Sequence, residues 1–379
     1  MRVEFNSELG KEKTEHKTEQ LTAINEPLLA WYRKSARVLP WREDPSAYHV
    51  WVSEIMLQQT RVETVRPYYE RFLKALPGVR DLAACPEDSL LKLWEGLGYY
   101  SRVRNMQRCA QMIVRDFQGC FPEDEKTLLT LPGIGPYTAG AIASIAFGRP
   151  VPAVDGNVMR VISRVTGSRA DILLPETRKR IDAALRESLP VHDAGAFNQA
   201  LMDLGAMICL PGKNAGCAVC PLYDRCVAGR GELTDQIPVR NVRTKKKKQE
   251  RTVLVIRDGT RAVLVRRAEK GLLAGLYEPP CLDGKAGADE ALAYLRSHQL
   301  SPLRIRKLPD AGHVFTHLVW EMTGFEILVE DMAESALPET EPPRQMPAGE
   351  WFAVRTGRIG EAYAIPSAYR AYVPYMTYE

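Results

Sequence analysis

The hydrophobic pattern changes its period once along the 379 residues, and this change constrains the fold more than any other feature. From about Pro27 to Ala228, apolar residues recur at three- and four-residue spacings, as in "YHVWVSEIMLQQTRVETVRPYYERFLKAL". This spacing predicts helices. Beyond about residue 250, "RTVLVIRDGTRAVLVRRA" sets two β-branched runs around Asp258 and Gly259, which predicts a hairpin. The pattern therefore predicts an all-α domain followed by an α/β domain.

Charge and composition set the expected boundaries. We expect a flexible polar tail over 1–24, a helical domain over 25–228, a basic linker over 229–250 and the α/β domain over 251–379. The linker carries Lys245 to Lys248. This basic run can be a solvated spacer or a DNA contact, and the sequence leaves both alternatives open. No apolar run reaches 18 residues, so no membrane span is expected. The N-terminus lacks an apolar signal-peptide core, so a cytoplasmic location is expected.

The segment "LPGIGPYTAG" at 131–140 predicts a tight connection between two helices. Gly133 and Gly135 can take positive φ, and Pro136 suits the first position of the second helix. The tip of such a helical hairpin exposes backbone N–H groups beside a helix N-terminus. It can therefore bind a DNA phosphate, or it can be an ordinary helix–helix turn.

Two carboxylates stand in unusually apolar surroundings. Glu54 lies within "VWVSEIMLQQT", so we expect a raised proton affinity, with Gln58 one turn on to orient it. Asp155 follows "VPAV" and could simply cap the next helix. Glu54 could equally face solvent. Together, the two acids would suit glycosidic chemistry, in which one protonates the leaving group and the other stabilises an oxocarbenium ion.

Four of the eight cysteines fall within 18 residues, separated by seven, two and five residues. They are Cys209, Cys217, Cys220 and Cys226. Such a density indicates a metal site, and the spacing leaves zinc and an iron–sulfur cluster both open. We expect a structural role, because nothing in the segment suggests an open catalytic position.

Several long motifs together resemble the adenine DNA glycosylases of the MutY kind, in the helix-hairpin-helix superfamily that includes endonuclease III. They are "LPWR", "WVSEIMLQQTRVETVRPYY", "WEGLGYYSRVRN", the turn, "VDGNVMRV" and "GAFNQALMDLGA". The resemblance implies a helix-hairpin-helix glycosylase domain with a 4Fe-4S cluster loop, although relatives place six residues, and this chain seven, between the first two cysteines. It implies removal of adenine mispaired with 8-oxoguanine or guanine in double-stranded DNA, in base excision repair. We expect a monomer associated with the bacterial nucleoid.

The resemblance also implies roles for single residues. Glu54 corresponds to the general acid and Asp155 to the carboxylate that stabilises the oxocarbenium ion. Tyr137 stands where strand-cleaving relatives have a lysine, which predicts base removal without lyase activity, because a phenol forms no Schiff base. The remaining matched positions are expected to contact DNA or the flipped base: Trp41, Arg42, Gln59, Thr60, Leu97, Gly98, Tyr99, Gly133, Gly135 and Gln199.

The last domain resembles a Nudix fold used for recognition. The magnesium-binding glutamate cluster of Nudix hydrolases is missing from "CLDGKAGADEALAYLRSHQL". Thr316 lies in "HVFTHLVW", where the family's lesion-reading loop usually carries serine. The competing hypotheses are an endonuclease III-like glycosylase with lyase activity, a non-catalytic DNA-binding protein and a nucleotide pyrophosphohydrolase. Tyr137 opposes the lyase, because it replaces the lysine. The pair of acids opposes a non-catalytic protein, and the missing glutamates oppose a pyrophosphohydrolase.

Overall fold

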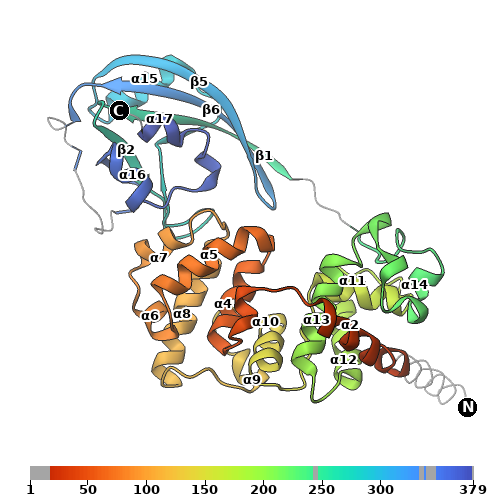
Figure 1. Ribbon diagram of the computed structural model, residues 1–379. Coiled ribbons are helices and arrows are strands. Elements are labelled where there is room, and N and C mark those ends of the chain that lie inside the picture. Colours follow the sequence, from red (N-terminus) through yellow and green to blue (C-terminus); the bar gives the residue numbers. More distant parts are fainter. Residues whose placement is uncertain (1–17, 242–245, 333–336, 339–346, 378–379) are drawn as a thin grey trace, which may run out of the picture. The chain divides into compact units, whose positions relative to one another are not determined.

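The computed structural model describes residues 18–241, 246–332, 337–338 and 347–377. The chain forms two compact units, which are described separately (Figure 1). The first comprises Met1–Ala83 and Asn105–Val242, and the second comprises Ala84–Arg104 and Arg243–Glu379. Residues 84–104 thus group with the second unit, although their helical pattern places them with the first. Periodicity along the chain reports secondary structure, not which segments pack together.

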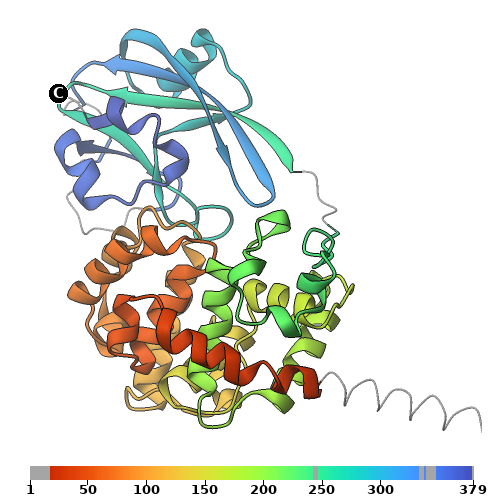
Figure 2. The same ribbon diagram turned by 45° about the vertical axis from the view of Figure 1, so that its right-hand side comes forward.

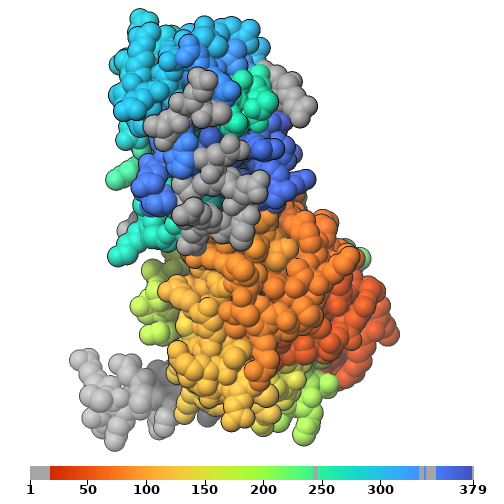
Figure 3. Space-filling model, turned by 90° about the vertical axis from the view of Figure 1, so that its left-hand side faces the viewer, coloured from red at the N-terminus to blue at the C-terminus, as the bar shows by residue number. Residues whose placement is uncertain are grey.

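The first unit is helical, as predicted. Its helices are α2 (Asn25–Ser35), α3 (Pro40–Glu43), α4 (Ala47–Leu57), α5 (Val62–Ala75), α6 (Val79–Ala84), α8 (Ser101–Asp116, shared with the second unit), α9 (Glu125–Leu128), α10 (Pro136–Ala141), α11 (Gly156–Val165), α12 (Pro175–Ser188), α13 (Ala194–Met207) and α14 (Val227–Arg230). A π-helical turn, η1 (Ile142–Ala146), continues α10, and short 3₁₀ turns lie at Gly212–Asn214, Cys217–Val219 and Tyr223–Arg225. Figure 3 shows one face of this unit, which the orange and yellow parts of the chain cover.

Helices α4 and α13 form the centre of the helical unit. Both are rich in apolar residues on every side, as expected of helices surrounded by others. Helix α13 packs against α2, α11 and η1, and α4 packs against α5, α10 and η1. Polar side chains on these two helices are therefore held among packed apolar neighbours, and several of them border the candidate site.

The predicted N-terminal tail is partly wrong. Residues 18–22 are helical, and Leu21 and Ile24 are buried, because their apolar side chains complete the core beside α2. Residues 1–17 lie outside the described part of the chain. The predicted linker also ends too late, since β1 begins at Lys247. Lys245 itself lies outside the described residues.

The second unit is built on a mixed sheet. In its described part, seven strands pair in the order β3-β2-β1-β6-β5, with β4 added to β1 and β7 added to β2. The strands are β1 (Lys247–Arg257), β2 (Arg261–Arg266), β3 (Tyr277–Glu278), β4 (Cys281–Asp283), β5 (Pro302–Val314), β6 (Leu318–Val329) and β7 (Trp351–Arg355). Strands β1 and β6 are parallel, and the predicted hairpin joins β1 to β2. Figure 2 shows the long antiparallel pair β5–β6.

Both faces of this sheet are covered, which explains the unbroken apolar run of β1. Val253 and Val255 pack on one face with residues of α16 (Thr356–Ala362) and α17 (Val373–Thr377). Leu254 and Ile256 pack on the other face with α15 (Ala288–Ser297). Successive side chains alternate between faces, so a strand buried on both sides lacks the polar alternation of a half-exposed strand. Helix α7 (Glu87–Leu93) and a 3₁₀ turn at Ser367–Tyr369 complete the unit. No helix among the described residues is long and apolar enough to cross a bilayer.

Candidate active site

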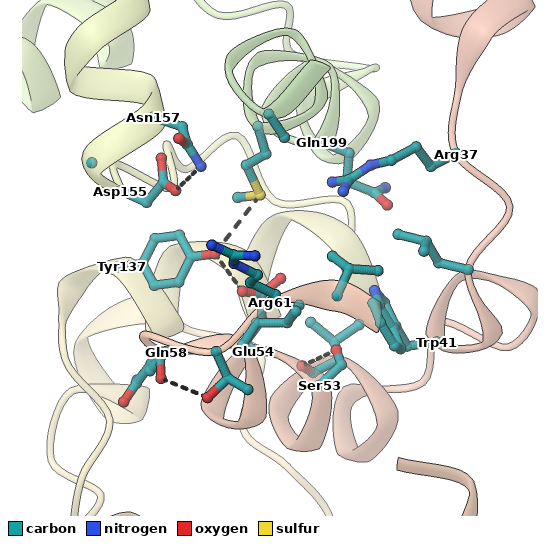
Figure 4. Close-up of a pocket in the computed structure, with 18 of the residues that line it drawn as sticks. Arg37, Trp41, Ser53, Glu54, Gln58, Arg61, Tyr137, Asp155, Asn157 and Gln199 are labelled. Carbon is teal, nitrogen blue, oxygen red and sulfur yellow. Dashed lines mark hydrogen bonds between the residues drawn. The ribbon is translucent and has the colours of Figure 1, made fainter. Parts of the chain in front are cut away.

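One pocket in the helical unit collects most of the residues selected from the sequence. Its volume is about 700 Å³, and it lies among α3, α4, α10, α13 and the start of α11 (Figure 4). The predicted residues that line it are Trp41, Arg42, Glu54, Gln59, Thr60, Tyr137, Asp155 and Gln199. A cavity of this size with polar groups converging from several helices is typical of a small-molecule or base-binding site.

Glu54 is buried in the middle of α4, as its apolar neighbours predict. Burial raises the pKa of its carboxyl from 4.5 to about 7, because a carboxylate loses its hydration there. The Tyr137 hydroxyl donates a hydrogen bond to Oε2 and partly opposes the shift. Gln58, the residue expected to orient Glu54, is the C-cap of α4 and lines the same pocket. Glu54 can therefore hold or release a proton near neutral pH.

Asp155 caps α11 and also faces the pocket. Its Oδ1 accepts from the Val158 N–H at 2.7 Å, and its Oδ2 accepts from the Asn157 side-chain amide at 3.0 Å. Burial raises the pKa of its carboxyl, while these donors act in the opposite direction. Capping and chemistry do not compete here, because the cap holds the carboxylate in one orientation (Figure 4).

Tyr137 reaches the pocket from the first turn of α10, directly after the predicted tight turn. Gly133 has φ +77°, and a Cβ there would lie 2.7 Å from Cβ of Asn105. Gly135 does not need positive φ: it is the extended N-cap of α10, with φ −96° and ψ 177°. Pro136 takes the first helical position as expected. The turn therefore requires only one of its two glycines on conformational grounds.

The rest of the pocket combines apolar walls with polar groups. Trp41 is buried and packs edge-on against Tyr69, with ring centroids 5.4 Å apart. Gln59 has φ 61°, an uncommon left-handed backbone for a residue other than glycine. Figure 4 shows Gln199 on the opposite side of Glu54 from Tyr137 and Asp155. Such strained or buried polar positions concentrate at functional sites.

The comparisons with known proteins agree with this geometry. Residues 52–190 match the family model of the HhH-GPD superfamily base excision DNA repair proteins, and residues 252–374 match that of the NUDIX domain. The adenine DNA glycosylase of Buchnera aphidicola subsp. Acyrthosiphon pisum is 32% identical over 293 residues, which cover 77% of this chain and 83% of that protein. The chain belongs to the adenine DNA glycosylases.

Further relatives extend the match. The human adenine DNA glycosylase is 32% identical over 394 residues, covering 88% of this chain and 70% of that protein. A thermostable thymine-DNA glycosylase structure superposes with a TM-score of 0.51 at 26% identity, covering 56% of this chain and 98% of that one. This adenine DNA glycosylase therefore has the helical base excision repair fold and a C-terminal Nudix domain, and its partner is DNA.

Several residues of the glycosylase pocket, or directly behind it, were missed by the sequence reasoning. Among them are Arg37, Asn157, Arg178, Met202 and Asp203. Asp203 had one available signal: it stands four residues after Gln199 in an otherwise apolar helix, where a charge has to find a partner. The arginines carried no signal, because arginine is common on any surface.

The other predicted DNA contacts lie outside the pocket. Gly98 and Tyr99 both have positive φ, 69° and 49°, and Tyr99 is 46% exposed. Within the second unit, the Tyr99 hydroxyl lies 2.8 Å from Oγ1 of Thr316. Leu97 is buried instead, so its side chain contributes to the core of the loop rather than to an exposed surface.

The four clustered cysteines of this adenine DNA glycosylase line one small cavity beside Arg164. Arg164 Nη1 lies 3.2 Å from Cys209 Sγ, and the Gly229 N–H donates to Cys226 Sγ at 3.3 Å. Burial raises the pKa of the Cys220 thiol to about 11, and the other cysteines add to this. The four thiols would therefore lose their protons here only when they bind a positively charged metal centre. The donor set fits the iron–sulfur cluster that the family implies.

Proposed function

We propose that this glycosylase excises adenine opposite 8-oxoguanine or guanine, by acid-assisted hydrolysis that leaves the DNA strand intact. One observation carries the proposal. A buried glutamate with a pKa of about 7 shares a pocket with a second, helix-capping carboxylate. Paired carboxylates whose surroundings allow one to be protonated and the other ionised suit the breakage of a glycosidic bond.

The proposed reaction begins with adenine flipped out of the duplex into the pocket. The protonated carboxyl of Glu54 gives its proton to N7 of adenine, so the base leaves as a neutral molecule. The electrons of the glycosidic bond go with the base, and an oxocarbenium ion remains on the sugar. Asp155 stabilises this cation, or bonds to it transiently, until water adds at C1′. The Tyr137 hydroxyl holds Glu54 in place throughout.

Base removal without strand cleavage follows from Tyr137. A lyase needs an amine at this point to attack the sugar carbon. Burial, reinforced by the charges of Glu54 and Asp155, raises the pKa of the Tyr137 phenol well above its usual value. The phenol therefore stays protonated and serves as a hydrogen-bond donor. An endonuclease III-like lyase is correspondingly disfavoured.

Recognition of the opposite base is proposed for the second unit. Tyr99 is exposed on a strained loop, and its hydroxyl pairs with Thr316. A threonine hydroxyl both donates and accepts, so it can bind an oxidised purine once Tyr99 releases it. Nudix phosphohydrolase activity is not proposed. In α15, Glu290 instead accepts from the Gly287 N–H at 2.8 Å and so serves as a helix cap.

The substrate assignment is tested with three duplexes in single-turnover assays. They contain adenine opposite 8-oxoguanine, adenine opposite guanine, and an oxidised pyrimidine. We expect strand breaks only at adenine, and only after hot alkali has cleaved the abasic site. Nicking without alkali would overturn the role given to Tyr137. Excision of the oxidised pyrimidine but not of adenine would overturn the substrate assignment.

We also propose that the four cysteines hold a structural 4Fe-4S cluster and that the enzyme acts as a monomer on nucleoid DNA. The four cysteines line one cavity beside Arg164, and four closely spaced thiolates suit such a cluster.

The purified enzyme is expected to be brown and to contain four iron atoms per chain. Cys220→Ser is expected to lower both the iron content and the melting temperature, because the buried ligand set is broken. Cys281→Ser, in the second unit, should leave the iron content unchanged and serves as the control. A colourless, zinc-loaded enzyme would contradict the cluster assignment. Iron analysis and visible absorption decide the question.

A further inference from the structure

Asp203 is a fully buried carboxylate that lies outside the pocket lining, yet it contacts two cations that belong to it. Arg42 meets it with both terminal nitrogens: Nη1 lies 2.8 Å from Oδ2, and Nη2 lies 3.0 Å from Oδ1. Arg37 adds Nε at 2.8 Å from Oδ1 and its backbone N–H at 3.2 Å from Oδ2. Such a two-pronged pair fixes the plane of a guanidinium as well as its position.

This arrangement matters because Arg42 and Glu54 line the same pocket. Burial is the largest cause of the raised pKa of Glu54. The positive charge of Arg42 acts in the opposite direction and lowers this pKa. A free guanidinium in a poorly hydrated pocket would pair with Glu54 and ionise it. An ionised Glu54 has no proton to give to the base. The pocket therefore needs a second anion that occupies Arg42.

We propose that Asp203 is a positioning residue: it holds Arg42 and Arg37 at the pocket wall and keeps the Arg42 guanidinium from forming an ion pair with Glu54. This inference rests on the proposed role of Glu54 as the acid. It is independent of which base stands opposite adenine.

The same contacts leave hydrogen-bond donors for the flipped base. Asp203 and the Arg37 carbonyl, which is 3.1 Å from Arg42 Nη1, accept three hydrogen bonds from Arg42. A guanidinium has five N–H groups, so two remain. A purine ring presents several nitrogen acceptors at its edges, which suits such donors. Asp203 thus acts on substrate only through the arginines.

Other ionisable groups also face Glu54, and they define the background for the test. Tyr137 approaches from α10, Asp155 from the start of α11 and Arg42 from α3. The remaining charged residues of the lining are Arg37, Arg61, Glu63 and Arg178. A substitution at Asp203 changes none of these side chains. A change in the pH profile therefore reports on the Asp203–arginine pair.

The test is the pH dependence of single-turnover excision by Asp203→Asn, with adenine opposite guanine. The amide keeps the shape of the side chain but loses its charge, so the arginines act on Glu54 uncompensated. We expect the rate at neutral pH to fall about tenfold, and the alkaline midpoint to move down by about one pH unit. Asp203→Glu should restore the midpoint. Asp193→Asn, at the exposed start of the same helix, should change neither quantity.

A second variant keeps the proposal testable if Asp203→Asn fails to fold. Arg42→Gln removes the cation, so the alkaline midpoint should move up, opposite in sign to Asp203→Asn. A slower Asp203→Asn enzyme with an unmoved midpoint and a lower melting temperature would show a purely structural role and overturn the proposal. An Asp203→Asn enzyme with an unchanged rate and an unchanged midpoint would also overturn the proposal. If Glu54→Gln is fully active, the proposed acid fails instead, which separates the two hypotheses.

Discussion

Replacing Glu54 by glutamine is expected to lower the single-turnover rate of adenine excision by about 10³-fold. Glutamine keeps the size of the side chain and an acceptor for the Tyr137 hydroxyl. It has no acidic proton, so adenine has to leave without protonation. General acid catalysis contributes about 10²–10⁴-fold in enzymes, which sets the expected loss. The measurement is excision at neutral pH with enzyme in excess over a duplex containing mispaired adenine.

The matched control for this prediction is Glu70→Gln. Glu70 lies on α5, is exposed and does not line the pocket, so its loss should leave the rate unchanged. Normal DNA binding by Glu54→Gln, measured by gel shift, would show that the substitution impairs the excision step and not the binding of DNA. A Glu54→Gln enzyme with more than a tenth of the wild-type rate would contradict the assignment of Glu54 as the acid.

The stability of Glu54→Gln provides an independent check, with a sign set by the raised pKa. A carboxyl with a pKa of about 7 in the folded protein and 4.5 as its ordinary value binds its proton more tightly in the folded state. Its stabilising contribution is present below pH 4.5 and is lost as the pH rises through about 7. Glutamine cannot ionise. The variant is therefore expected to melt at a higher temperature than the wild type above pH 7.

The proposed catalytic acid could be selected from the sequence, because its signal is local. Glu54 stands among apolar residues on every side of one helix, and such a glutamate has to be buried. Asp155 was equally visible as an acid at a helix start. Gln58 was chosen by the same local logic, and it lines the same pocket as Glu54. Tyr137, 83 residues away, is the one that donates to Glu54.

Contacts that depend on the tertiary fold could not be predicted in this way. Arg42 and Asp203 are 161 residues apart, and the sequence around each residue does not predict the ion pair between them. The predicted tail failed for a related reason: Leu21 and Ile24 are too few to form an apolar pattern, yet the core beside α2 buries both. Local patterns identify which groups carry chemistry. Packing decides which groups hold them in place.

Replacing Asp155 by asparagine is expected to slow excision by about 10²–10³-fold. Asparagine caps helices as well as aspartate does, so α11 and the contact with the Val158 N–H should persist. The variant lacks the negative charge that faces the developing oxocarbenium ion. Loss of a single group that stabilises transition-state charge typically costs this much. Single-turnover excision with mispaired adenine again measures the effect.

Asp124 offers a control with the same local geometry. It caps α9 and accepts from the Thr127 N–H at 3.0 Å, but it lies outside the pocket lining. Asp124→Asn should leave the rate unchanged. A slow Asp155→Asn enzyme would then owe its defect to the lost negative charge and not to a change in helix capping. An Asp155→Asn enzyme that is as fast as Asp124→Asn would remove the carboxylate from the mechanism.

The two carboxylates are also coupled, which gives Asp155→Asn a second, independent outcome. Burial is the largest cause of the raised pKa of Glu54, and the charge of Asp155 adds to it. Removing that charge makes ionised Glu54 less costly, so the pKa of Glu54 falls. The residual activity of Asp155→Asn is therefore expected to decline at a lower pH than that of the wild type. A slow enzyme with an unmoved alkaline midpoint would show that Asp155 acts on the sugar alone, whereas a lowered midpoint shows that it also keeps the acid protonated.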